Sequence, residues 1–388
     1  MNESPIAPRD RNRQRVVVAM SGGVDSSVAA ALLVQQGYEV IGMMMRLWSE
    51  SGSGPSTPAN RCCTPDQMAD ARRVADRLGI PFYVADVQKH FRQTIVQFFL
   101  DEHDAGRTPN PCVECNRQIR FTYLLDRALA LDADFLATGH YARVVREGGS
   151  YLLKQGKDNH KDQSYVLHTF RQEQLAHVLF PIGEYTKDEV RQLARDHDLL
   201  VASKQESQDL CFLNDGDYRR FIRDHSAQTH PAGPILDLDG RELGQHEGLP
   251  FYTIGQRKGL GIAAAEPLFV VGKDLSRNAL IVGPREALGV DELMARDVNW
   301  ISGQPPAGPI HAEVKIRYKA APVQSVITPL DGNQAHVAFS TPVLGVTPGQ
   351  AAVFYEGDTC LGGGLIRDGV QPFNTRWETA AAEDTTNQ

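Results

Sequence analysis

Residues 16–31 read VVVAMSGGVDSSVAAA, and this stretch decides the fold of the chain. The apolar run Val16–Ala19 predicts a buried strand and the residues from Val28 onward predict a helix, so a tight loop must join them. Gly22 and Gly23 let the backbone turn without a Cβ atom in the way, and the Ser and Asp residues are expected to cap the helix. Backbone N–H groups at such a helix start bind anions. The stretch therefore predicts a phosphate-binding strand–loop–helix unit.

The loop lacks the Gly-Lys-Ser/Thr sequence of the common nucleoside triphosphatase loop, in which the lysine reaches the phosphates. Asp25 is therefore expected to be a Mg²⁺ ligand or a helix cap. The sequence SGGVDSS resembles the pyrophosphatase-type loop (PP-loop) of enzymes that split ATP into AMP and pyrophosphate to activate a carbonyl oxygen as an adenylate. An ordinary glycine-rich turn of an α/β sheet is the alternative interpretation.

The composition is that of an ordinary globular protein, with 41% hydrophobic and 23% charged residues. At 388 residues the chain is too long for one core, so two or three domains are expected. No apolar stretch approaches the roughly 20 residues of a membrane span, and the polar N-terminus lacks the apolar core of a signal peptide. We therefore expect a cytoplasmic protein. The net charge of -8 argues against a uniformly basic nucleic-acid-binding surface but not against a local one.

Strand and helix patterns alternate in the first half of the chain, which predicts a parallel, doubly wound sheet with ligands at the carboxyl ends of its strands. Strands are expected at 16–19, 40–45, 81–87 and 135–140, and helices at 65–78, 91–100, 121–130 and 186–198. Short alternating segments near the C-terminus predict an antiparallel β-barrel. We therefore predict an α/β protein with a PP-loop ATPase domain, a small mixed central domain, an RNA-binding β-barrel and a disordered tail, at residues 1–211, 212–287, 288–377 and 378–388.

The six cysteines point to reactive thiols or a metal site rather than to a secreted disulfide scaffold. Cys112 and Cys115 lie in GRTPNPCVECNR (residues 106–117), where two prolines predict an extended loop and the CxxC spacing is that of a thioredoxin-type or metal-binding pair. Neighbouring arginines would favour the thiolate, which is the attacking form. Two ordinary loop cysteines are the alternative. Cys211, in SQDLCFL, predicts by itself only a small buried apolar side chain.

Several motifs together resemble one enzyme family. They are, in order, SGGVDSS, GRTPNPCVECN, ATGHYAR, KDQSYVL, QDLCFL, YTIGQRKGLGI, TPGQAAVFY and LGGG. From Val16 to Ile366 the chain resembles the tRNA-specific 2-thiouridylases (tRNA-uridine 2-sulfurtransferases). The resemblance implies that ATP, with Mg²⁺, adenylates the C2 oxygen of the wobble uridine (U34) in Lys, Glu and Gln tRNAs. Sulfur then arrives from a cysteine persulfide supplied by a relay protein or a cysteine desulfurase, and 2-thiouridine, AMP and pyrophosphate are the products.

The resemblance also assigns roles to residues. Cys211 carries the persulfide, and Cys115 attacks it or acts as its thiol partner, which leaves a disulfide that must be reduced. The expected ATP-binding residues are Ala19, Met20, Ser21, Gly22, Gly23, Val24, Asp25, Ser26, Met45 and Gly139. The expected tRNA-binding residues are Asn110, Pro111, Cys112, His140, Lys161, Asp162, Gln163, Arg317, Tyr318 and Gln350. Without the resemblance, residue 140 would be a satisfied structural histidine, 161–163 a solvated turn, and 317–318 a cross-strand surface pair.

Cys112 departs from the family pattern, because many members carry Asp there as a candidate general base near the uridine. A thiol is a poorer base near neutral pH, with a reference pKa of about 8.5. Cys112, Cys115 and Cys211 could instead hold a [4Fe-4S] cluster through three thiolates, and we rank this below the persulfide relay. Another PP-loop adenylating ligase and a non-catalytic tRNA-binding protein are the remaining alternatives. Cys62, Cys63 and Cys360 receive no role.

Overall fold

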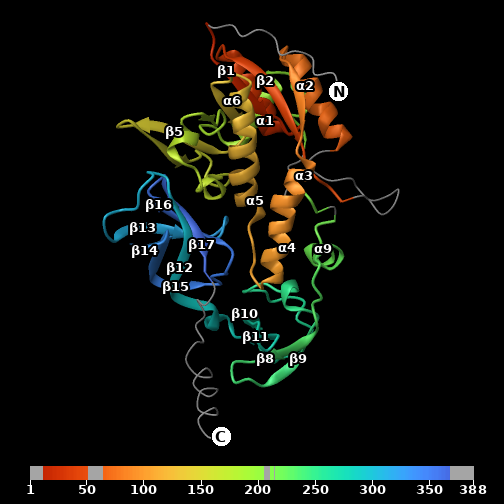
Figure 1. Ribbon diagram of the computed structural model, residues 1–388, viewed down its shortest axis with the longest axis vertical. Coiled ribbons are helices and arrows are strands. Elements are labelled where there is room, and N and C mark those ends of the chain that lie inside the picture. Colours follow the sequence, from red (N-terminus) through yellow and green to blue (C-terminus); the bar gives the residue numbers. More distant parts are fainter. Residues whose placement is uncertain (1–11, 51–63, 205–209, 214, 368–388) are drawn as a thin grey trace.

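The computed structural model describes residues 12–50, 64–204, 210–213 and 215–367, which form three β-sheets. A parallel sheet lies at one end of the long axis, a small mixed sheet lies at the other end, and a large antiparallel sheet lies beside the helices between them (Figure 1). The predicted tail 378–388 and the cysteines Cys62 and Cys63 lie outside the described residues.

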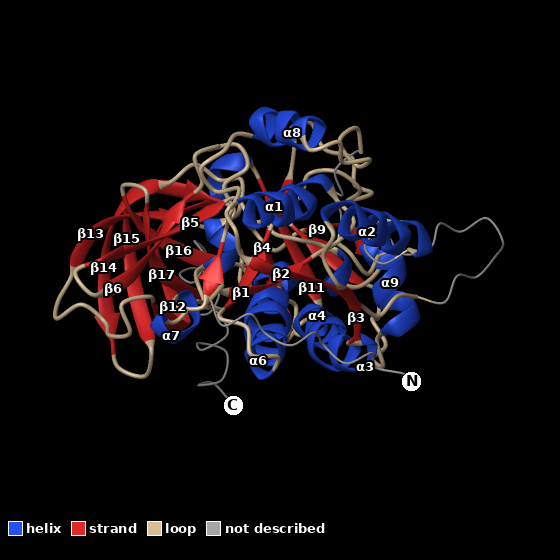
Figure 2. Ribbon diagram, turned by 90° about the horizontal axis from the view of Figure 1, so that it is seen from above, coloured by secondary structure: helices blue, strands red, loops and turns tan. Residues whose placement is uncertain are grey.

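The first sheet is fully parallel, with strand order β3-β2-β1-β4-β7. Its strands are β1 (Arg15–Ala19), β2 (Glu39–Arg46), β3 (Phe82–Asp86), β4 (Phe135–Thr138) and β7 (Val178–Leu179). Helices α1 (Val24–Gln35), α2 (Pro65–Leu78) and α8 (Lys187–Asp196) cover one face, and α6 (Leu125–Ala130) covers the other (Figure 2). Helices α3 (Gln88–Phe91) and α4 (Gln97–Asp104) follow β3 and lead away from the sheet (Figure 1). The predicted doubly wound sheet is confirmed.

The two faces of this sheet have separate cores, because successive side chains of a strand point to opposite sides. In β1, Val16 and Val18 pack with Val28 of α1 on one face. Val17 packs with Leu124 on the other face. A strand that is covered on both sides reads as an unbroken apolar run, which is why β1 was recognisable in the sequence.

Two long helical runs lead away from the sheet toward the other domains (Figure 1). The first joins α3 to α4 through a π-helical segment, Arg92–Val96. The second joins α5 (Pro111–Glu114) to α6 through the π-helical segment Cys115–Leu124. π-Helical turns are frequent at functional sites. Across the described ranges, we find no helix that combines the length and the apolar character needed to cross a bilayer.

The central region is a small mixed domain, as predicted. Helix α9 (Tyr218–His225) precedes a sheet of order β10-β11-β8-β9. Its strands are β8 (Gly233–Leu236), β9 (Glu242–His246), β10 (Phe269–Asp274) and β11 (Ala279–Gly283). β8 and β11 are parallel, and the other pairs are antiparallel.

The C-terminal strands form a closed antiparallel barrel, which confirms the predicted β-barrel. The strands are β12 (Gly289–Trp300), β13 (Ile310–Lys315), β14 (Val323–Leu330), β15 (Gln334–Leu344), β16 (Ala351–Glu356) and β17 (Thr359–Ile366). Pairing of β12 with β17 closes the barrel. The hairpin of β5 (Ala142–Glu147) and β6 (Ser150–Gln155) adds to β17 from outside, so part of the N-terminal half extends the barrel sheet.

Candidate active site

The loop between β1 and α1 lies between helix α2 and the ATGH segment that follows β4. Gly22 has a φ angle of +71°, and a Cβ atom there would lie 2.3 Å from the carbonyl oxygen of Gln67. A Cβ atom on Gly139 would lie 2.6 Å from the backbone nitrogen of Ser26. Only glycine permits these close approaches. The expected ATP-binding residues 19–26 and Gly139 are therefore neighbours at the carboxyl edge of the parallel sheet.

Helix α1 begins without a side-chain cap. Its N-cap residue is Gly23, whose backbone is extended, and no side chain caps the helix there. The Ser27 hydroxyl instead donates to the Gly23 carbonyl oxygen at 2.8 Å, and the Ser21 N–H donates to Ser26 Oγ at 3.1 Å. The prediction that Ser and Asp residues cap this helix is wrong. An uncapped helix start leaves its first N–H groups to bind an anion.

Asp25 forms an ion pair with Lys187, the first residue of α8. The Lys187 Nζ atom lies 2.7 and 3.0 Å from the two carboxylate oxygens, and the Tyr141 hydroxyl donates to the same carboxylate at 2.8 Å. The side chain of Lys187 is 10% exposed and that of Asp25 is 32% exposed. Lys187 thus brings a cation to the loop from 162 residues away in the sequence, which sequence reasoning missed.

A second lysine contacts the loop itself. Lys204 Nζ donates to the Gly22 carbonyl oxygen at 2.9 Å and to the Asp70 carboxylate at 2.7 Å. Burial raises the pKa of Asp70, but hydrogen bonds from Lys204 and Arg73 outweigh it and hold that pKa below its usual value. Lys204 therefore links the phosphate loop to helix α2.

Cys115 and Cys211 belong to the same apolar region although they are distant in sequence. Cys115 is buried in the cluster that contains Phe91 and Phe212, and the half-buried Cys211 packs against that cluster. Met45, near the end of β2, packs against it as well. The fold thus brings both predicted catalytic thiols and one predicted nucleotide-binding residue to one cluster.

Cys112 and its neighbours form a helix start rather than an extended loop. Pro111 is the first residue of α5, and the Asn110 side chain caps the helix by accepting from the N–H groups of Cys112 and Val113 at 3.1 and 3.4 Å. Proline suits this position because its missing N–H would have no helical partner. Asn110 therefore has a structural role that the sequence analysis missed, and Cys112 is exposed beside it.

The three cysteines do not form a metal site in this structure. Over the described ranges, which include Cys112, Cys115 and Cys211, no three His, Cys, Asp or Glu side chains are grouped so that they could hold a metal ion. A cluster held by three thiolates requires all of them around one centre. The arrangement therefore does not fit the iron–sulfur alternative.

The segment before α5 is held by both of the other domains. Lys273 of β10 donates to the Gly106 carbonyl oxygen at 2.9 Å. From the barrel, Pro348 accepts the N–H of Thr108 at 2.9 Å, and Gln350 Nε2 donates to the Thr108 carbonyl oxygen at 2.9 Å. Gln350 was expected to contact tRNA, and here its amide binds the protein backbone.

His140 is buried and faces the protein interior here, contrary to the expectation that it faces RNA. Its Nδ1 atom lies 2.6 Å from Thr138 Oγ1, and its ring packs beside Phe121 and Phe180. Burial, with a smaller effect of the Arg120 charge, lowers the pKa of His140 to about 3. The residue is therefore a neutral imidazole at physiological pH.

The tripeptide 161–163 is likewise largely structural in this structure. Asp162 is buried, and its carboxylate accepts from the N–H groups of Gly156 and Ser164, both at 3.1 Å. Gln163 Oε1 accepts the Tyr141 N–H at 3.0 Å. The burial of Asp162 disagrees with its expected contact to tRNA, and the solvated-turn interpretation is wrong for it as well.

Arg317 and Tyr318 lie in a turn after β13, so they are not a cross-strand pair. Arg317 is exposed, and its Nη2 atom lies 3.5 Å from the Leu344 carbonyl oxygen. The half-buried Tyr318 ring lies 6.2 Å from the ring of Tyr165. An exposed guanidinium next to an aromatic ring is a combination that can bind phosphate and stack on a base.

Family models match all three parts of the chain. Residues 14–215 match the family model described as tRNA methyl transferase HUP domain. Residues 219–284 match the tRNA methyl transferase PRC-barrel domain, and residues 290–366 match the aminomethyltransferase β-barrel domain.

Curated relatives match over nearly the full length. A protein named tRNA-specific 2-thiouridylase MnmA from Chloroflexus aggregans is 49% identical over 352 residues, which are 90% of this chain and 98% of the relative. Relatives with the same name from Magnetococcus marinus and Geobacter metallireducens are 52% and 51% identical, over 91% and 92% of this chain and 99% and 98% of those proteins. The chain belongs to the tRNA-specific 2-thiouridylase family.

Proposed function

We propose that this protein is an ATP-dependent sulfurtransferase that replaces the C2 oxygen of a tRNA uridine by sulfur. The observation that carries the proposal is the shared apolar cluster of Cys115, Cys211 and Met45. The reaction needs a nucleotide to activate the oxygen and thiols to deliver the sulfur. The relatives that match nearly the whole chain are named tRNA-specific 2-thiouridylases, which supports this proposal.

The first half of the proposed reaction is adenylation. The uridine C2 oxygen attacks the α-phosphorus of ATP, pyrophosphate leaves, and the oxygen can then depart as part of AMP. We assign the ATP phosphates to loop 19–26, and the adenosine to the space beside Gly139 and Met45. Lys187 and Lys204 bring positive charge to this loop. Asp25 is a suitable ligand for Mg²⁺, which would neutralise phosphate charge.

The second half transfers sulfur from a persulfide on Cys211. The Cys115 thiolate attacks the Cys211 sulfur, the bond to the outer sulfur breaks, and hydrosulfide leaves. Hydrosulfide adds to C2 of the adenylated uridine, and AMP departs with the original oxygen. A Cys115–Cys211 disulfide remains, and an external thiol reductant must supply two electrons to restore both thiols.

The proposal also includes the binding site and identity of the tRNA, and the class of sulfur donor. We assign the target base to the exposed Cys112 with Asn110 and Pro111, and the tRNA backbone to Arg317 and Tyr318 of the barrel. The wobble uridine of Lys, Glu and Gln tRNAs is the proposed target. A sulfur-relay protein or a cysteine desulfurase is the proposed donor. Both assignments rest on the family to which the chain belongs.

The test is mass spectrometry of nucleosides from tRNA incubated with the protein, ATP and a persulfide source. We expect 2-thiouridine from the wild type and none from Cys115→Ser or Cys211→Ser. Pyrophosphate release should persist in both variants, because adenylation needs neither thiol, and this serves as the control for folding. Full thiolation by either variant would contradict the assignment. A tRNA-binding protein without catalysis would release no pyrophosphate, and an adenylating ligase would release it without forming 2-thiouridine.

A further inference from the structure

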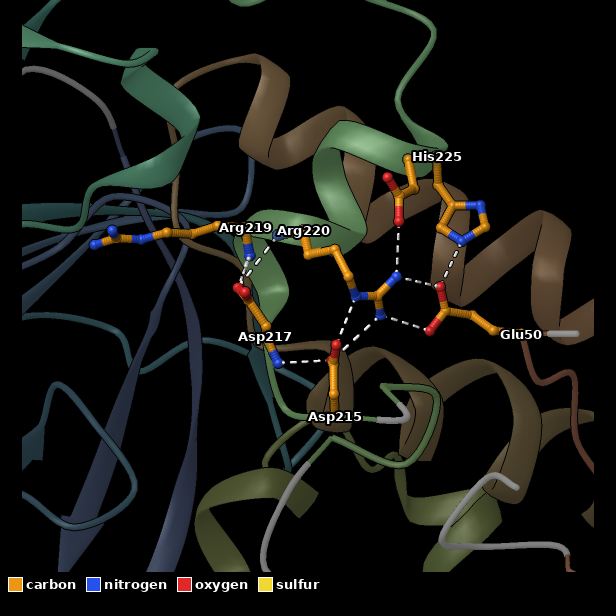
Figure 3. A network of polar contacts seen from close by, with 7 residues as sticks. Glu50, Asp215, Asp217, Arg219, Arg220 and His225 are labelled. Carbon is orange, nitrogen blue, oxygen red and sulfur yellow. Dashed lines mark hydrogen bonds and ion pairs between the residues drawn. The ribbon is translucent and has the colours of Figure 1, made fainter. Parts of the chain in front are cut away.

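The guanidinium group of Arg220 on α9 joins three carboxylates (Figure 3). Its Nη atoms lie 3.0 and 2.8 Å from the two carboxylate oxygens of Glu50. Its Nε atom lies 2.6 Å from Asp215, and Nη1 lies 2.8 Å from Asp224. Glu50 and Asp215 come from two other parts of the chain, whereas Asp224 is on the same helix. Arg220 therefore holds two segments together.

Asp215 connects this network to the segment that carries Cys211. Phe212, next to the cysteine, is 1% exposed, and its ring lies 5.3 Å from that of Phe221 on α9. Asp215 accepts the N–H of Asp217 at 2.9 Å, and Asp217 in turn caps α9. Phe212 and Asp215 are thus each fixed to α9, the first by an aromatic contact and the second by the ion pair with Arg220.

Glu50 connects this network to the end of β2, which borders the proposed nucleotide site. Glu50 follows β2 after Trp48, whose ring lies 6.3 Å from Phe221 and 5.7 Å from His225. The Glu50 side chain is 9% exposed and lies 2.8 Å from His225 Nε2. Upstream on the same strand, Met45 packs against the cluster of Cys115. The segment that borders the proposed nucleotide site is therefore anchored to the same helix as the segment that carries Cys211.

The carboxylates of Glu50 and Asp215 are ionised near neutral pH. Burial raises the pKa of Glu50, but hydrogen bonds from Arg220 and His225 outweigh it and leave this pKa below its usual value. The hydrogen bond from Arg220 lowers the pKa of Asp215. A guanidinium with fixed planar geometry binds several carboxylates in defined directions, which an ammonium group cannot do. Arg220 therefore fixes distance and orientation, not only charge.

We propose that Arg220 is a positioning residue for sulfur transfer, which holds the Cys211 segment at a fixed place relative to the end of β2. This proposal rests on the proposed function, since it concerns the cysteine that would carry the persulfide. Transfer between two sulfur atoms requires a defined approach, and small displacements of reacting groups lower such rates strongly. Adenylation does not involve Cys211 and should not depend on the contact between Arg220 and Asp215.

The test compares Asp215→Asn with Asp224→Asn in the full-length protein. Both variants remove one carboxylate from Arg220, and the two side chains are similarly exposed, at 44% and 52%. Only Asp215 lies on the Cys211 segment. With the persulfide preloaded, we expect Asp215→Asn to lower single-turnover 2-thiouridine formation about tenfold, in the range known for misplaced reacting groups. Pyrophosphate release should stay within about twofold of wild type in both variants, and Asp224→Asn should thiolate normally.

The reactivity of Cys211 shows whether a slower transfer comes from a displaced Cys211 segment. The rate at which iodoacetamide alkylates Cys211, followed by peptide mass spectrometry, should change in Asp215→Asn and in Arg220→Lys, but not in Asp224→Asn. Equal effects of the two Asp variants, or normal sulfur transfer in both Asp215→Asn and Arg220→Lys, would overturn the proposal. The Cys211→Ser variant distinguishes a failure of the Arg220 proposal from a failure of the proposed function. An active Cys211→Ser removes the persulfide assignment itself. An inactive Cys211→Ser, together with normal transfer in both Asp215→Asn and Arg220→Lys, removes only the role of Arg220.

Discussion

The ion pair of Lys187 with Asp25 places a cation and an anion together beside the phosphate loop. Lys187 is largely buried, so its charge is less hydrated and acts more strongly on a neighbouring phosphate than a surface lysine would. In the proposed function, Mg²⁺ bound with ATP would compete with Lys187 for the Asp25 carboxylate. Lys187 would then bind the phosphates, which have the greater negative charge.

Replacement of this lysine tests that role. We expect Lys187→Gln to lower kcat/KM for ATP in pyrophosphate release by about tenfold to about a hundredfold, since a hydrogen bond to a charged group contributes about 1.5–3 kcal/mol. Lys157→Gln is the matched control, because Lys157 forms an exposed ion pair with Glu189 on the same helix. Unchanged kinetics with ATP in Lys187→Gln would show that the ion pair serves only to dock α8.

Contiguous residues at this site could be predicted from the sequence, and distant ones could not. The loop 19–26 carries its own signal in the change from apolar strand to glycine and serine. Lys187 and Lys204 reach the loop over 162 and 182 residues, and no local pattern encodes such a pairing. Asn110 is a local signal that was overlooked: its contact to tRNA stays a prediction, but its cap could have been predicted, because Asn before a helical Pro is an N-cap signal.

At the scale of elements, the turn around Gln350 determines where the segment before α5 lies. Gly349 has a φ angle of +88°, and a Cβ atom there would lie 3.1 Å from Thr108 backbone atoms. The Gln350 amide then donates to the carbonyl oxygens of Thr108 and Pro109. The barrel thus positions the segment that leads into the helix on which Cys112 lies.

Replacement of Gln350 distinguishes this positioning from RNA contact. We expect Gln350→Ala to lower the single-turnover rate of thiolation about tenfold, because two hydrogen bonds of about 1 kcal/mol each hold the segment. The Kd for tRNA, measured by filter binding, should change less than about twofold. Gln324→Ala, which alters an exposed glutamine of the same barrel, should affect neither quantity. A weaker Kd with an unchanged rate would restore the predicted RNA contact.

Elements with strong local signals were predicted well. Helix α2 covers the predicted residues 65–78 because Thr64 forms a capping box with Gln67 and Gly79 ends the helix in the left-handed conformation. The hairpin of β5 and β6 was not assigned to any sheet. Its partner is β17, through the pairing of Lys154 with Thr359, and a strand partner so distant in sequence leaves no periodic signal.

At the scale of the whole molecule, buried histidines lie where the parts of the protein meet. The ring of His103 on α4 stacks on Tyr218 of α9, and its pKa is lowered to about 3, chiefly by burial. The backbone of His168 accepts from Asn299 of the barrel, and burial lowers its pKa to about 4. His140, with a pKa of about 3, lies beside the first sheet. The folded protein keeps all three neutral.

This neutrality makes the fold sensitive to mild acid. Below pH 6.5 the unfolded chain binds a proton on each histidine and the folded protein does not, so the free energy of unfolding falls as the pH decreases toward the folded pKa. At pH 5 each histidine should cost up to about 2 kcal/mol relative to pH 7. Urea unfolding at the two pH values measures this loss. His140→Gln should reduce it by about that amount, whereas His160→Gln, at an exposed site, should leave it unchanged. Equal losses in wild type and His140→Gln would mean that His140 binds its proton in the folded protein.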